Sequence, residues 1–268
     1  MRYPPGMTER DIQDAATALW KNWQQSLRIP ALPEPARPAD RAEAYAIQAR
    51  LAGLSGQGIF GWKIAATSVA GQKHIRVDGP LAGRLLDGRV LKSGAMISLA
   101  GNQMRVAEAE FAFRFRSDLS KRKQPYTMDE VLDAVESLHT AIEVPDSRFE
   151  DYTVVGAPQL IADNACACWF ILGPPAEVKW RELDLSQHKV EGYRNLKHAA
   201  SGSGANVLGD PRIALTWVAN ELIQFGDELR AGQIVTTGTC ITPIPVVPGD
   251  HVRMDFGVLG SVEAEFSQ

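Results

Sequence analysis

Two glutamates separated by one residue stand out in the segment from Val106 to Phe115, whose sequence is VAEAEFAFRF. The alternation of apolar residues predicts a β-strand, in which successive side chains point to opposite faces. Glu108 and Glu110 then project from one face, with α-carbons about 6 to 7 Å apart. Oxygen ligands at that spacing can converge on a hard divalent cation such as Mg²⁺. A solvated outer face paired with lysines is the alternative interpretation.

A third carboxylate, Glu143, lies in the apolar segment TAIEV, between Ile142 and Val144. A carboxylate buried in such a strand needs a partner, and Glu143 would complete a set of three oxygen ligands. Mg²⁺ usually keeps water ligands and recruits substrate oxygens beside its few carboxylates. The predicted site is therefore open to substrate rather than purely structural.

Lys63 and Asp78 are two further candidates. Lys63 lies in GIFGWKIAAT, an apolar, glycine-flanked strand, and buried lysines are rare unless they are paired. It either neutralises one of the glutamates, meets an anionic substrate or, on an edge strand, extends its amine to solvent. Asp78, in the loop RVDGPLAG, is a candidate acid or base, although aspartates in turns usually cap backbone amides.

The elements that must position these residues differ between the two ends of the chain. Thr8 and Asp40 are predicted N-caps of two helices, over residues 8–29 and 41–53, joined by a proline-rich link. We predict that they form a small N-terminal helical cap over residues 1–57. Short glycine-bounded, β-branched segments then indicate a β-rich catalytic domain over residues 58–268.

Two helices are predicted within this β-rich domain. One begins at Thr127, runs to residue 138 and leads into a strand over residues 139–144; the other begins at Asp210 and ends near Gly226. Because helices do not alternate with every strand, we predict an α+β fold with a mostly antiparallel β-roll, rather than a doubly wound parallel sheet. Residues 195–201 are not predicted as a strand, and the glycines that follow lack dinucleotide-binding spacing.

Composition excludes several classes of partner. The 268 residues carry 28 basic and 32 acidic side chains, a net charge of -4, so we expect no nucleic-acid partner. Apolar runs are too short for a membrane span, the N-terminus does not resemble a signal peptide, and only three cysteines occur. We expect a cytoplasmic protein without a membrane partner. A serine-hydrolase elbow and the H-E-x-x-H metal motif are both missing from the sequence.

Five motifs in order resemble the family of 2-keto-4-pentenoate hydratases and 4-oxalocrotonate decarboxylases, in the fumarylacetoacetate hydrolase superfamily. They are GWKIAATS (61–68), AEAEFAF (107–113), AIEVPDSR (141–148), LIADNA (160–165) and LRAGQIVTTGT (229–239). The likeness covers about residues 58–266. It implies a β-roll of the fumarylacetoacetate hydrolase type and a homo-oligomer.

The resemblance also implies roles for particular residues. Mg²⁺ or Mn²⁺ would be held by Glu108, Glu110 and Glu143, and Lys63 and Asp78 would be catalytic. Thr239 would contact the substrate carboxylate. Cys166 stands where many of these hydratases have serine, a stronger hydrogen-bond donor, and with Arg148 it is a further candidate for binding substrate.

The implied reaction is hydration of a small 2-hydroxy-2,4-dienoic acid, through its 2-oxo tautomer, to a 4-hydroxy-2-oxo acid in the catabolism of aromatic compounds. Decarboxylation of a 2-oxo-enedioate is the first alternative, and it needs a second carboxylate pocket for which Arg148, Arg84 or Lys73 are candidates. Acylpyruvate hydrolysis is less favoured, because the first histidine, His74, follows the Lys63 strand. A non-catalytic partner subunit is the last alternative.

Overall fold

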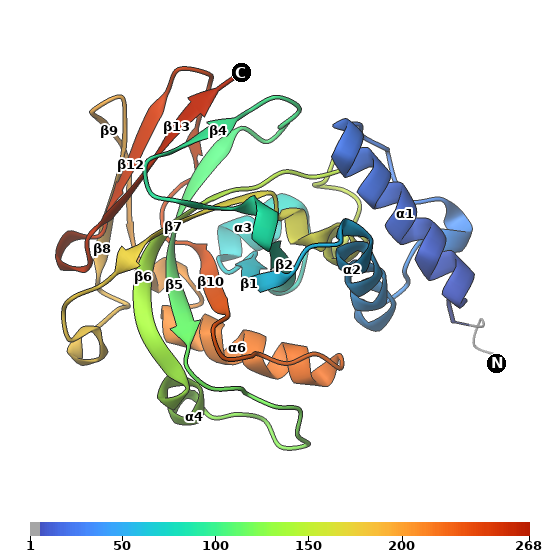
Figure 1. Cartoon of the computed structure of the whole chain (residues 1–268), viewed down its shortest axis with the longest axis horizontal. Coiled ribbons are helices and arrows are strands. Elements are labelled where there is room, and N and C mark those ends of the chain that lie inside the picture. Colours follow the sequence, from blue (N-terminus) through green and yellow to red (C-terminus); the bar gives the residue numbers. More distant parts are fainter. Residues whose placement is uncertain (1–5) are drawn as a thin grey trace.

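The computed structural model describes residues 6–268 and contains two curled sheets with helices packed around them (Figure 1). The larger sheet has the order β2-β1-β10-β5-β6-β7-β3, and β11 pairs with β5. Its strands are β1 (Ile59–Ala65), β2 (Leu81–Leu86), β3 (Val90–Lys92), β5 (Val106–Phe115), β6 (Val135–Val144), β7 (Trp169–Pro175), β10 (Ile234–Thr239) and β11 (Ile244–Pro245).

The smaller sheet has the order β4-β13-β12-β8-β9. Its strands are β4 (Ala95–Ser98), β8 (Lys189–Arg194), β9 (Lys197–Ser203), β12 (His251–Asp255) and β13 (Ser261–Ser267). The three phenylalanines of β5 have no exposed surface. One of them, Phe111, packs edge-on against Phe256, with ring centroids 5.2 Å apart. The phenylalanine face of the central strand β5 is therefore buried in the core.

Both sheets are mixed, which corrects the expected mostly antiparallel roll. Parallel pairs join β1 to β10, β3 to β7 and β4 to β13, while antiparallel ladders join the other neighbours. The parallel partners are far apart in the sequence, and local alternation carries no information about which distant strand pairs with which. The helices are few, as the α+β prediction expected.

The N-terminal helices are α1 (Glu9–Gln25) and α2 (Arg41–Ser55). The caps at Thr8 and Asp40 are confirmed, since each side chain accepts a hydrogen bond from the first turn of its helix. α2 packs against both α1 and α5 (Ala157–Ala162), and the buried Gln48 side chain donates to the carbonyls of Ala82 and Ile161. The division into a cap and a catalytic domain stays a prediction.

Two elements differ from the predictions because strand pairing outweighs local preference. α4 (Met128–Asp133) has the expected capping box, but it ends early, since Val135 already pairs with Phe115 and begins β6. The segment that was not predicted as a strand forms β9, which pairs with β8 across a two-residue turn. Asn195 and Leu196 in this turn both have positive φ, the conformation of a tight hairpin.

The remaining helices flank the ends of the larger sheet. α6 (Pro211–Gln224) begins after its predicted cap, Asp210. α3 (Val69–Ile75), capped by Ser68, was not predicted. Within residues 6–268, no helix combines the length and the apolar character needed to cross a membrane. Assembly into a homo-oligomer stays a prediction.

The ends of several central strands lie side by side at one end of the larger sheet. β10 and β6 both run antiparallel to β5, whereas β1 runs parallel to β10. The beginning of β5 therefore lies beside the ends of β1, β6 and β10. Four different strands carry candidate residues near this end of the sheet: Lys63, Glu108, Glu143 and Thr239.

Candidate metal and substrate site

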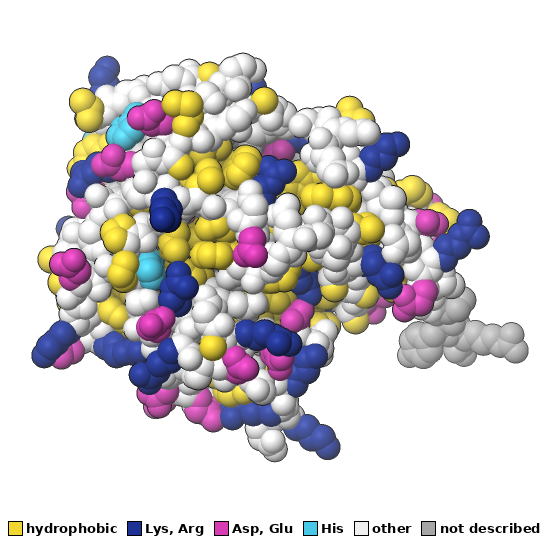
Figure 2. Space-filling view, in the orientation of Figure 1, with side chains coloured by type: hydrophobic (Ala, Val, Ile, Leu, Met, Phe, Trp, Pro, Cys, Tyr) yellow, Lys and Arg dark blue, Asp and Glu magenta, His cyan; other side chains and the backbone are white. Residues whose placement is uncertain are grey.

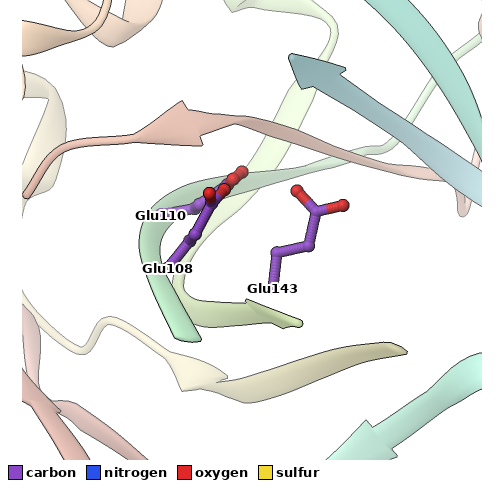
Figure 3. Close-up of side chains that lie close together, drawn as sticks. All are labelled: Glu108, Glu110 and Glu143. Carbon is purple, nitrogen blue, oxygen red and sulfur yellow. The ribbon is translucent and has the colours of Figure 1, made fainter. Parts of the chain in front are cut away.

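Three glutamates lie close together at this end of the larger sheet. Glu108 and Glu143 are directly opposite each other in the β5–β6 ladder, and Glu110 follows Glu108 on the same face of β5. One carboxylate oxygen of each lies within 4.8 Å of the others. Figure 3 shows Glu108 and Glu110 leaving β5 in the same direction, with the Glu143 carboxylate beside them. The structure therefore brings together the three residues that the sequence singled out.

The oxygens of these glutamates are only partly satisfied by the protein. One oxygen of Glu110 accepts from the Thr236 hydroxyl and from the Gly238 amide (2.8 Å), which leaves Oε1 without a partner. Lys63 Nζ forms an ion pair with Glu143 Oε1 at 3.0 Å, although neither Glu143 oxygen has a hydrogen bond of good geometry. Two buried carboxylates and the half-buried Glu108, facing one ammonium, fit a hard divalent cation, because such ions take oxygen ligands and would supply the missing charge.

Burial and mutual repulsion control the protonation of this site. Burial and the charge of Glu143 raise the pKa of Glu108 to about 7, against the opposing effect of Lys63. Burial, followed by the charges of Glu143 and Glu108, places the pKa of Glu110 well above its usual value. For Lys63, burial lowers the pKa, but the three glutamates outweigh it and raise the pKa to about 12. Lys63 is therefore an ammonium at neutral pH.

Mg²⁺ should stabilise the protein more at about pH 8 than at about pH 5.5. Because the pKa of Glu108 is raised, its contribution to the stability of the metal-free protein is complete below its ordinary pKa of 4.5 and is lost as the pH rises through about 7. A cation must displace the protons of these carboxylates, so it competes best at high pH. We expect the Mg²⁺-induced rise in melting temperature to be about twofold larger at the higher pH. Equal rises in a thermal shift assay would contradict this prediction.

A strained backbone segment positions Lys63. Its Nζ donates to the carbonyl of Ala165 (2.9 Å), which lies in a run of left-handed residues, Asn164, Ala165 and Cys166. The Asn164 side chain holds this run against β2, since it accepts from the Arg84 amide (2.7 Å) and donates to the Arg84 carbonyl (2.8 Å). Gly83 allows the approach, because a Cβ there would lie 2.3 Å from the Asn164 carbonyl oxygen. Asn164 therefore acts on Lys63 through the backbone.

Replacing Asn164 with alanine should lower the free energy of unfolding by about 2–4 kcal/mol, because two buried backbone groups of Arg84 lose their partners. Urea denaturation measures this loss. Asn195→Ala is the matched control, since Asn195 is also left-handed and its side chain also makes two hydrogen bonds, with the His251 amide (2.9 Å) and Asp250 (2.6 Å), but it lies on an exposed turn. It should cost about 1 kcal/mol or less, because water can replace lost partners there. Equal losses in the two variants would show that burial of the hydrogen bonds does not decide the effect.

A cavity of about 540 Å³ opens beside the glutamates. Lys63, Glu108, Cys166 and Thr239 all line it, so the predicted metal, catalytic and substrate-binding positions share one space. Burial and the charge of Asp163 raise the pKa of the Cys166 thiol to about 12, so it stays protonated. The Thr239 hydroxyl donates to the Ile241 carbonyl (2.9 Å). Each side chain therefore offers a neutral polar group to the cavity.

Two predicted residues are not brought to this cavity. Asp78 lies on the exposed loop between α3 and β2. Arg148 is fully buried, where it donates to Asp163 and to the carbonyls of Asp146 and Ala167, and its guanidinium stacks on Trp23. Its contacts assign Arg148 to holding the loop after β6. The roles that the resemblance implied for both residues stay predictions that the geometry of the cavity does not support.

The structure adds polar residues that the sequence did not indicate. Tyr152 and His74 both line the cavity, and the Tyr152 hydroxyl lies 3.1 Å from His74 Nε2. Burial raises the pKa of Tyr152, and the charge of Glu108 adds to this effect. Asn206 also lines the cavity. The three residues lie in unrelated segments, so no local pattern could have grouped them.

The mixed sheets place three carboxylates that could hold a divalent ion beside an open cavity of ligand size. Residues 88–267 match the family described as fumarylacetoacetate (FAA) hydrolase, C-terminal. The chain therefore belongs to the fumarylacetoacetate hydrolase family.

Relatives of similar length carry hydratase names. The chain is 33% identical to a 2-keto-4-pentenoate hydratase of Paraburkholderia xenovorans, over 97% of this chain and 96% of the relative. It is 32% identical to a 2-hydroxyhexa-2,4-dienoate hydratase of Comamonas testosteroni, over 82% of each chain. Among solved structures, a 4-oxalocrotonate decarboxylase from Pseudomonas putida G7, complexed with magnesium and adipate, superposes with a TM-score of 0.88 at 26% identity. That superposition covers 98% of this chain and 100% of the other.

Proposed function

We propose that this protein is a metal-dependent hydratase that converts a 2-hydroxy-2,4-dienoate to a 4-hydroxy-2-oxo acid. The observation that carries the proposal is the set of three converging carboxylates, two of them buried, and one ammonium beside a substrate-sized cavity. The named hydratases that the chain resembles over nearly its whole length support this choice of reaction.

Glu108, Glu110 and Glu143 would hold Mg²⁺ or Mn²⁺. The solved decarboxylase, which has the same fold, contains magnesium. A divalent ion at this position would act as a Lewis acid that stabilises negative charge on the 2-oxygen of the substrate. The unpartnered oxygens of Glu110 and Glu143 are the donors that this structure makes available.

The side chains around the cavity would bind the substrate and move its protons. The Lys63 ammonium donates a hydrogen bond to an anionic substrate oxygen, and Thr239 and Cys166 contact the carboxylate end. The 2-hydroxyl loses its proton and C5 gains one, which forms the 2-oxo-3-enoate; water then adds its oxygen to C4 and a proton to C3. Tyr152, whose hydroxyl lies 3.1 Å from His74 Nε2, is one protonated group in the cavity that can serve these transfers.

Decarboxylation is the second candidate, and the arrangement of cations disfavours it. A 2-oxo-enedioate has a second carboxylate that needs a cation, for which Arg84, Arg148 and Lys73 were the candidates. Arg84 is buried against Gln48 and Asp227, and Arg148 is bound to Asp163. Lys73 is exposed, and none of the three lines the cavity. The second carboxylate would therefore lack a partner.

The purified protein with Mg²⁺ should bleach the ultraviolet absorbance of 2-hydroxypenta-2,4-dienoate, and mass spectrometry should find the product heavier by one water. EDTA should abolish the reaction, and added Mg²⁺ should restore it. Release of CO₂ from a 2-oxo-enedioate, without hydration of the dienoate, would replace the hydratase with a decarboxylase. A protein that binds Mg²⁺ but changes neither compound would support a non-catalytic subunit.

The cytoplasmic location and the place of this reaction in aromatic catabolism stay predictions. The names of two relatives give 2-keto-4-pentenoate and 2-hydroxyhexa-2,4-dienoate as their substrates. Chemistry at this site requires only that a preceding reaction supplies a 2-hydroxydienoate.

A further inference from the structure

The cavity extends well beyond the carboxylate centre. From Glu108, β5 leads back to Val106 and on to Met104, and from Lys63, β1 leads through Ala65 to α3. Each step along a strand moves a wall residue about 3.3 Å away from the centre. These residues all line the same cavity. The outer part of this one cavity, called the outer chamber below, therefore lies away from the glutamates, where it would face the tail of a substrate rather than its chelating end.

Apolar side chains form most of the wall of this outer chamber. They come from α3, β2, the beginning of β5, α5 and the loop after β10, and include Ile75, Leu81, Met104, Val106, Leu160 and Pro243. In the space-filling view, hydrophobic side chains gather in the middle of the face shown, around the place that α3 has in Figure 1 (Figure 2). Such a wall favours an apolar ligand group over water.

The charges in the cavity lie at its inner end. Among the described residues that line it, Lys63 and Glu108 belong to the carboxylate centre, and His74 is the one other side chain able to carry a positive charge. His74 Nε2 already faces the Tyr152 hydroxyl at 3.1 Å. A carboxylate on the far end of a substrate would therefore meet a largely apolar wall without a lysine or arginine among its described residues, and its one candidate cation, His74, already contacts Tyr152.

The volume also exceeds what the smallest substrate needs. About 540 Å³ lies within the range of roughly 300–1,000 Å³ of pockets that bury drug-sized ligands. A five-carbon dienoate bound at the glutamates would leave the outer chamber to water. Filling that chamber with methylene or aromatic groups removes apolar surface from water on both sides.

We infer that the protein selects 2-hydroxy-2,4-dienoates that carry an uncharged apolar substituent on C5, an alkyl or arylalkyl tail, over the unsubstituted acid and over dicarboxylates. This inference rests on the proposed hydratase function and specifies the substrate class. Ala70, on α3, is a specificity-determining residue, because it lines the cavity from its exposed rim.

A substrate series tests the inference directly. With Mg²⁺ present, kcat/KM should rise about fourfold for each of the first methylenes added at C5. A substrate whose tail ends in a carboxylate should react at least about a hundredfold more slowly than the alkyl compound of the same length. These two results together would show that the protein selects its substrate by the length of the tail and by the absence of charge on it.

A matched pair of variants locates the effect in the outer chamber. Ala70→Phe places a large side chain in the cavity wall, whereas Val69→Phe places the same side chain on the adjacent residue of α3, which is 69% exposed and does not line the cavity. Ala70→Phe should lower kcat/KM for the long-tailed substrate at least about tenfold more than for the unsubstituted acid. Val69→Phe should leave the ratio of the two rates unchanged.

The outcomes separate this inference from the proposed function. If wild-type protein hydrates no dienoate of the series, the proposed function fails. If it hydrates the unsubstituted acid or the dicarboxylate at least as well as the alkyl compound, the function stands and the selectivity is overturned. Equal effects of Ala70→Phe on all tail lengths would overturn the assignment of the chamber to the tail.

Discussion

Replacing Glu110 with glutamine should lower kcat/KM at least about a thousandfold, or roughly 4 kcal/mol of transition-state stabilisation. Glu110 is fully buried, and its Oε1 is free to bind a cation while the other oxygen is held by Thr236 and Gly238. Glutamine keeps the volume of the side chain but removes the negative charge that the ion needs. Steady-state kinetics with Mg²⁺, together with calorimetric titration of the ion, measures both losses.

The Glu110→Gln variant should remain folded. Burial and the neighbouring carboxylates raise the pKa of Glu110, so its negative charge is unfavourable in the metal-free protein. Removing that charge should therefore not lower the melting temperature without Mg²⁺. The Mg²⁺-induced rise in melting temperature should disappear. Glu136→Gln, on the exposed end of the neighbouring strand β6, should change neither quantity. Normal turnover in Glu110→Gln would refute the metal centre proposed here.

Replacing Lys63 with methionine should lower kcat by about 10²- to 10⁴-fold while Mg²⁺ still binds. Methionine has a similar length and is apolar, so it suits a site where Lys63 is only 2% exposed. Loss of the ammonium leaves three carboxylates without a positive neighbour, which should strengthen Mg²⁺ binding. Chemistry and metal affinity should therefore change in opposite directions.

Two measurements distinguish this role of Lys63 from a structural one. The metal-free Lys63→Met variant should be destabilised at neutral pH, because Glu143 loses its ion pair, and Mg²⁺ should restore much of the melting temperature. Lys92→Met, on the exposed edge of β3, is the control and should resemble wild type. If turnover and Mg²⁺ affinity of Lys63→Met fall together, the role of Lys63 is to position the glutamates and not to contact the substrate.

Local patterns in the sequence predicted the parts of the site that depend on one segment. The alternation from Val106 to Phe115 predicted that Glu108 and Glu110 share one face of a strand, and the structure agrees. Apolar neighbours marked Glu143 as buried. The caps at Thr8 and Asp210 were also confirmed, because a cap is read from a few consecutive residues.

Other features depended on contacts between distant segments. The early start of β6 followed from pairing with β5, which outweighed the helical pattern of residues 134–138. Arg148 was expected near substrate, but Asp163 binds it inside the protein. Tyr152 and His74 meet only because the loop after β6 folds over α3. The sequence pattern of a single segment cannot predict a contact of this kind between two distant segments.

The sequence by itself determined which side chains could do chemistry, since residue type and strand alternation are local properties. Only the tertiary structure decided that Glu143 faces Glu108, that Lys63 pairs with Glu143, and that an apolar chamber lies beyond them. The physical reason is that register, parallel pairing and cavity shape arise when remote segments pack together. The free energy that stabilises these features comes from contacts between segments and not from the sequence of any single segment.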